Sequence, residues 1–150
     1  MTFRRASIFL AVAILSEAMP FLSARADEFL DAMKANNAGW LAAYNRKDAE
    51  ALGKMYDEDA LLVGLTIEPI RGAKNIEAFW ATRVAKCHDH TWTILDTGRE
   101  KTLAYQVAEW TVTCSTDEGN KGFSGNTVRV LEELPDGRWM TKVHAVTRHS

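Results

Sequence analysis

The side chain whose type is best suited to chemistry is His144, which lies in a C-terminal segment of alternating periodicity. An imidazole that points into an apolar pocket can act as a general base near neutral pH. Tyr44, Tyr56 and Gln106 are polar side chains that can orient a bound group beside it. The sequence offers no evident carboxylate partner for His144, and the alternative is a place on the outer or interface face of a sheet. His144 is therefore the candidate base of any reaction, with its use left open.

Two short polar clusters resemble metal sites. Asp57-Glu58-Asp59 lacks the alternating ligands and glycine turn of a calcium loop, so we predict a solvated turn there. In the second cluster, His88 and His90 would share one strand face, but a zinc site needs further ligands. The neighbouring Cys87 is better used in a disulfide. We expect no metal and no cofactor.

The first 26 residues have the three parts of a secretory signal peptide. Arg4-Arg5 is the basic region, and Ile8–Leu15 is an apolar run too short to span a bilayer. Ala24-Arg25-Ala26 has the small-residue pattern of a cleavage site. We therefore predict a signal peptide at residues 1–26, a mature domain at 27–150 and a periplasmic or secreted location. The general and the twin-arginine export routes both stay open.

Charge and motifs exclude several function classes. The 150-residue chain carries a formal net charge of −2, and the predicted cleavage removes more basic than acidic residues. An acidic mature chain argues against nucleic acid or an anionic membrane as a partner. The sequence contains no P-loop, dinucleotide fingerprint, nucleophile elbow or H-E-x-x-H motif.

Apolar periodicity changes from helical to alternating along the chain, which predicts an α+β domain with three N-terminal helices on a curved antiparallel sheet. The predicted helices are 27–44, 48–56 and 72–86, and the predicted strands are 61–63, 91–96, 102–114, 125–134 and 139–147. Along the second long strand, Ala104, Gln106, Ala108 and Trp110 point to one face.

The two cysteines fall close together in the predicted register. If the hairpin turn lies at Gly98–Lys101, Cys114 faces the region of Cys87. In an oxidising compartment two adjacent cysteines should form a disulfide. Two free buried thiols are the alternative.

The order of the motifs resembles the NTF2-like superfamily, closest to its SnoaL-like and DUF4440 branches. The residues that carry this resemblance are Trp40, Tyr44-Asn45, Lys47-Asp48, Leu52, Met55-Tyr56-Asp57-Glu58-Asp59-Ala60, Arg71-Gly72, Ile76, Phe79-Trp80, Ala104-Tyr105-Gln106-Val107-Ala108, Trp110, Gly125, Val128, Val130, Asp136-Gly137 and Trp139. The resemblance implies a cone, in which a bent sheet wraps around the first helix and encloses a deep pocket. It also implies a homodimer.

Aromatic side chains are too numerous to fill a small cone completely, so some of them should line its pocket. The expected pocket residues are Trp40, Tyr44, Tyr56, Phe79, Trp80, Arg83, Trp92, Gln106, Trp110 and Arg129. We place Arg83 and Arg129 at the mouth, where a guanidinium can hold an anionic ligand.

The steroid-isomerase pattern of the superfamily is incomplete in this chain. Isomerase-like members carry a carboxylate base four residues beyond the position of Ala60, which is Gly64 here, and a tyrosine at the position of Trp40.

Two function classes remain. The first is a small-molecule binding module or homodimeric module without catalysis. The second is an isomerase, cyclase or dehydratase that uses His144 as its base.

Overall fold

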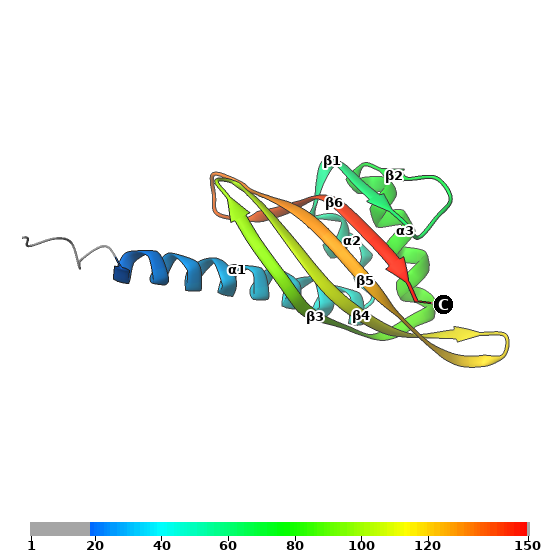
Figure 1. Cartoon of the computed structure of the whole chain (residues 1–150). Helices are drawn as coiled ribbons and strands as arrows, with labels where there is room; N and C mark the ends of the chain where they lie inside the picture. Colours follow the sequence, from blue (N-terminus) through cyan, green and yellow to red (C-terminus); the bar gives the residue numbers. More distant parts are fainter. Residues whose placement is uncertain (1–18, 150) are drawn as a thin grey trace, which may run out of the picture.

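The structure, a computed structural model, describes residues 19–149 and has an α+β architecture. The elements are α1 (Met19–Asn45), α2 (Ala49–Gly53), β1 (Tyr56–Val63), β2 (Ile70–Arg71), α3 (Ala73–Lys86), β3 (Cys87–Glu100), β4 (Leu103–Thr116), β5 (Gly119–Glu133) and β6 (Trp139–Arg148). Three helices pack against a curved sheet, which confirms the predicted fold class (Figure 1).

The sheet has six strands in the order β2-β1-β6-β5-β4-β3. The four long strands β3 to β6 form an antiparallel meander that curves over α1 (Figure 1). However, β1 pairs with β6 in the parallel direction, so the sheet is mixed, with one parallel pair beside the antiparallel strands. The parallel pair arises because the chain crosses the whole sheet between β1 and β6.

Helix α1 begins at Met19, eight residues before the predicted start, and extends beyond the edge of the sheet (Figure 1). The predicted signal peptide lies mostly outside the described residues, and its cleavage site falls within α1. The export signal therefore stays a prediction. No helix in the described part of the chain is long and apolar enough to cross a membrane.

The acidic segment Asp57-Glu58-Asp59 belongs to β1, so the predicted turn is wrong. Helix α2 ends at Gly53, and Tyr56 already pairs with Thr141 of β6. The acidic residues lie at the register shift between Tyr56 and Leu61, where the pairing of β1 with β6 is interrupted. Asp57 forms an ion pair with Lys142 of the neighbouring strand β6, and the two charged atoms lie 3.1 Å apart.

The cysteines form the predicted disulfide between Cys87 and Cys114. They are direct partners in the β3–β4 ladder. The hairpin turn lies at 101–102, beyond the predicted position. Two register shifts, one between His88 and Thr91 and one between Ile94 and Asp96, compensate for this difference.

The interior of the cone is divided into two apolar clusters. The larger surrounds Trp40 and the smaller surrounds Met33. Between these two residues on α1 lies Asn37, which is buried, as are Gln106 and Arg129 on the facing strands. A polar layer therefore crosses the core beneath the larger cluster.

Gly125 permits the close contact that fixes Trp110. A Cβ atom at Gly125 would lie 1.9 Å from the carbonyl oxygen of Thr147 and 2.8 Å from the Trp110 ring. The Trp110 indole donates hydrogen bonds to the carbonyls of Asn126 and Thr147, at 3.2 and 3.1 Å. A side chain at position 125 would displace this ring from the inner face of the sheet.

Candidate functional site

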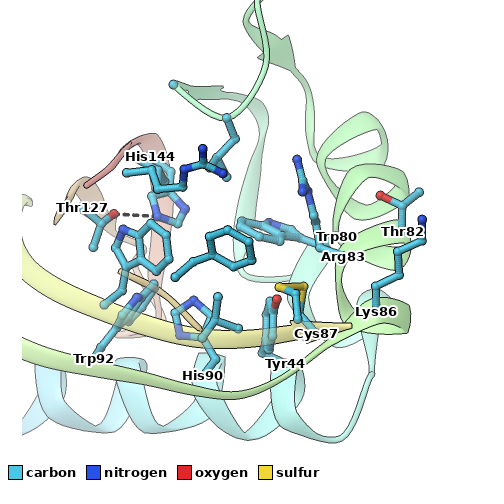
Figure 2. A pocket seen from close by; sticks show the side chains of 18 of the residues that line it. Tyr44, Trp80, Thr82, Arg83, Lys86, Cys87, His90, Trp92, Thr127 and His144 are labelled. Carbon is cyan, nitrogen blue, oxygen red and sulfur yellow. Dashed lines mark hydrogen bonds between the residues drawn. A yellow bond between two sulfur atoms is a disulfide. The ribbon is translucent and has the colours of Figure 1, made fainter. Parts of the chain in front are cut away.

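A cavity of about 590 Å³ lies between α1, α3 and the inner face of the sheet. Figure 2 shows side chains from the helices and strands directed around this common space. The lining residues are Trp40, Tyr44, Gly64, Leu65, Trp80, Thr82, Arg83, Lys86, Cys87, His90, Trp92, Trp110, Val112, Cys114, Ser115, Thr116, Phe123, Thr127, His144, Val146 and Arg148. None of these lining residues is an aspartate or a glutamate.

Most of the predicted site residues lie on the cavity wall. Those that line it are Trp40, Tyr44, Trp80, Arg83, Trp92, Trp110 and His144. Four others do not. Tyr56 lies behind the wall as a partner of His144, Phe79 packs beside Trp80, and Gln106 and Arg129 lie in the polar layer.

Trp40 is the centre of the aromatic wall. It is fully buried and stacks on Trp92 with ring centroids 4.3 Å apart and on Tyr44 at 5.3 Å. Trp80 and His90 meet it edge-on at 5.2 Å each. Because offset-stacked and edge-to-face contacts are the favoured aromatic geometries, these rings hold one another in fixed positions.

The hydroxyl of Tyr56 joins this wall to the sheet. The indole N–H groups of Trp40 and Trp80 donate to the Tyr56 oxygen at 3.3 and 3.0 Å. An indole nitrogen can only donate, so both lone pairs of the phenol oxygen are used. The phenol proton is therefore the one that bridges to Nδ1 of His144, 2.7 Å away.

This arrangement determines the tautomer of His144. Because Nδ1 accepts from Tyr56, a neutral ring carries its proton on Nε2 and donates it to Oγ1 of Thr127 at 2.8 Å (Figure 2). Thr127 in turn donates to the carbonyl of Ala145 at 3.1 Å. Each donor in this series from Trp40 and Trp80 through Tyr56, His144 and Thr127 has an acceptor, so the network is complete.

His144 is held in its neutral form. Burial lowers its pKa well below 6.5, and the positive charge of Arg129 acts in the same direction, as does the proximity of His90. Burial also raises the pKa of Tyr56 to about 12. The Nδ1 lone pair, which a general base would use, already accepts a hydrogen bond. The predicted base therefore faces the cavity but has no free basic site.

His90 is a cavity residue that we do not predict from the sequence. The register shift places Asp89 in a left-handed conformation, with φ of 55°, so His88 is turned outward and His90 inward. The expectation that both histidines share one face is wrong. Nδ1 of His90 has no partner among the described residues, and burial lowers the pKa of its ring to about 4. In the described chain, no group of three or more metal-ligating side chains is placed to hold an ion.

Arg129 lies in the core, and its predicted position at the mouth is wrong. Its guanidinium is fully buried and donates through Nη2 to the amide oxygens of Asn37 and Gln106. It also lies 4.6 Å from the ring centroid of Trp92. A long side chain on an inward-facing position of a central strand reaches the opposite helix rather than solvent.

Gly64 lines the cavity at the position where isomerase-like members of the superfamily carry their carboxylate base. Its φ is 91°, and a Cβ atom there would lie 1.9 Å from the carbonyl oxygen of Val146. No side chain fits this position unless the backbone moves. The cavity therefore lacks both a carboxylate and the space for one at this point.

Comparison with known proteins relates the chain to one family. The family model described as a SnoaL-like domain matches residues 38–141. A search of the curated proteins found no match. The DUF4440 branch is not supported specifically and stays a prediction.

Similar solved structures share the fold. A protein of unknown function from Mycobacterium tuberculosis has 22% identity and a TM-score of 0.75, covering 88% of this chain and 78% of that one. A ketosteroid isomerase-like protein from Erwinia carotovora atroseptica has 18% identity and a TM-score of 0.71, covering 81% and 96%. An NTF2-like protein with a cystatin-like fold from Novosphingobium aromaticivorans has 16% identity and a TM-score of 0.71, covering 89% and 91%. At these identities the likeness shows the fold alone.

The Tyr56 network predicts a large effect from removing one oxygen. Tyr56→Phe leaves the indoles of Trp40 and Trp80 and Nδ1 of His144 without their shared partner. We expect unfolding in urea to show a loss of about 2 to 4 kcal/mol, because each unsatisfied buried group costs about 1 to 3 kcal/mol. Tyr105→Phe is the control, since its exposed hydroxyl donates a hydrogen bond to Asp96 and has no other hydrogen-bond partner in residues 19–149. Equal losses in the two variants would contradict the network.

The buried histidines predict that stability decreases in acid. The unfolded chain takes up a proton on His90 near pH 6.5, whereas the folded chain does so only near pH 4. Below pH 6.5 the unfolded state binds more protons, so stability falls between pH 6.5 and about 4. Urea unfolding across this range should show a smaller decrease for His90→Phe than for the wild type. An unchanged profile in His90→Phe would refute the assignment.

Proposed function

The chain belongs to the SnoaL-like domain family, and on that premise we propose that it is an exported protein that binds a small apolar or aromatic molecule in its cavity without transforming it. The observation that carries this proposal is an aromatic-walled cavity of about 590 Å³ that has no carboxylate on its lining and whose predicted base, His144, already accepts a hydrogen bond from Tyr56. Pockets for small molecules typically measure about 300 to 1,000 Å³. The rigid wall of stacked rings favours flat, apolar ligands.

The enzymatic alternative is weakened by the same geometry. Isomerase chemistry needs a carboxylate base and an oxyanion hole, and one structural neighbour is described as ketosteroid isomerase-like. Here the base position is Gly64, and the indole of Trp40 already donates to Tyr56. His144 would first have to break its bond to Tyr56 before it could accept a proton from a substrate. These features favour binding over catalysis.

The outer face of the sheet supports a homodimer. Large apolar side chains are exposed there on β3, β4 and β5, namely Leu95, Leu103, Tyr105 and Val128. Exposed apolar patches commonly mark protein interfaces, and a two-fold dimer uses one such patch on both subunits. Sedimentation at micromolar concentration should show a dimer, and a monomer would refute this part of the proposal.

The export part of the proposal rests on the N-terminal sequence and the disulfide. The Cys87–Cys114 bond is compatible with an oxidising compartment. A periplasmic or secreted location follows if the signal peptide is used. Fractionation of expressing cells, with the N-terminus of the exported product determined, tests this, and a cytoplasmic full-length chain would refute it.

Binding in the cavity can be tested by filling it. Val112 lies on the inner face of β4 and lines the cavity, whereas its neighbour Thr111 points outward and is exposed. N-phenyl-1-naphthylamine, a neutral aromatic probe that fluoresces in apolar sites, should bind the wild type and Thr111→Trp. We expect Val112→Trp to reduce its affinity at least about tenfold, because the indole occupies ligand space. Equal binding to both variants would contradict binding in this cavity.

A further inference from the structure

The mouth of the cavity carries three positive charges. Arg83 and Lys86 extend from α3 and Arg148 from β6, and all three line the cavity and are exposed. Figure 2 shows Arg83 and Lys86 on the same helix at one side of the space. None of the three forms a salt bridge with any residue in 19–149, although acidic residues outnumber basic ones in the chain. Their charges are therefore available to a ligand.

Two of these cations are held in place by rings. The guanidinium carbon of Arg83 lies 5.1 Å from the centroid of Phe79, and that of Arg148 lies 5.2 Å from the centroid of Phe123. Cation–π contacts of this kind limit the freedom of the arginine head groups. The planar guanidinium can then receive a carboxylate through two parallel hydrogen bonds.

A fourth positive charge lies behind the wall. Arg129 has no carboxylate partner, and its Nε and Nη1 atoms have no hydrogen-bond partner among the described residues. Its ring neighbour Trp92 forms part of the cavity wall. Buried charges in proteins are usually paired, so this unpaired cation adds a positive potential to the interior. The charges at the mouth and the charge behind Trp92 therefore both favour a negatively charged ligand.

The charges select among the ligands that an aromatic pocket can accept. Rings such as Trp40, Trp92 and Trp110 could hold a quaternary ammonium group by cation–π contacts. In this cavity that group would meet four like charges and no carboxylate. A neutral aromatic molecule meets no such penalty, and an anionic one gains attraction to the mouth.

We propose that the cavity binds an aromatic carboxylic acid, with its ring body against the Trp40–Trp92 wall and its carboxylate at Arg83 and Arg148. This inference rests on the proposed binding function and names its ligand class. Arg83 lies on α3 and Arg148 on β6, so two different elements each supply a guanidinium to the cavity lining. The aromatic body supplies the apolar contact, and the acid group supplies the orientation.

The test uses two competitors that differ only in charge. Naphthalene-2-carboxylate and naphthalene-2-carboxamide have nearly the same shape, and each is titrated against bound N-phenyl-1-naphthylamine on the full folded protein. We expect the carboxylate to displace the probe at a concentration at least roughly tenfold lower, as a charge-assisted hydrogen bond provides. Arg83→Gln and Arg148→Gln should each remove most of that advantage.

A matched charge control separates local contact from general attraction. Lys101→Gln removes the same charge at the β3–β4 turn, at the opposite end of these strands from Cys87 and Cys114. It should keep the full preference for the carboxylate. Equal displacement by both competitors in the wild type, or an unchanged preference in both arginine variants, would overturn the inference while leaving the binding function intact. If the probe fails to bind the wild type, the binding function is itself overturned and the inference with it.

Discussion

One hydroxyl group joins the parts of the structure on which the cavity depends. The Tyr56 oxygen on β1 contacts Trp40 of α1, Trp80 of α3 and His144 of β6. These residues come from four elements that are distant in sequence, and they meet at an atom that is fully buried. Because indole nitrogens only donate, the phenol must donate onward to the imidazole. The direction of every hydrogen bond in the network follows from this one constraint.

The same network gives the cavity its chemical character. A wall of interlocked rings is well suited to hold a flat ligand in one place, since its side chains are already ordered before binding. The cost is that the imidazole of His144 is fully hydrogen-bonded and held neutral. A site of this kind contributes shape and potential rather than proton transfer. The positive charges at the mouth and behind Trp92 are then the main features that discriminate among ligands.

Local patterns predicted the parts of the fold that depend on neighbouring residues. The alternation from Ala104 to Trp110 identified the inner face of β4, and the motifs around Tyr56 identified the family. Features that depend on partner strands were not predictable in the same way. The bulge at Asp89, which turns His90 inward, is set by pairing with β4.

Side-chain destinations were harder to predict than strand faces. Arg129 lies on a predicted strand, but its burial, in place of the predicted position at the mouth, depends on Asn37 and Gln106, which accept its hydrogen bonds. Asp57 resembles part of a turn because acidic residues favour turns, yet it belongs to β1 and forms an ion pair with Lys142 of β6. Both errors arise from contacts between segments that are far apart in sequence.

The central claim is that Tyr56 fixes His144 as a neutral ring without a free basic nitrogen. Nitrogen-15 NMR of the histidine side chains, recorded from pH 5 to 8, measures this directly. We predict that His144 stays neutral, with its proton on Nε2, over the whole range. A ring that titrates within this range, or that carries its proton on Nδ1, would contradict the account and restore His144 as a candidate base.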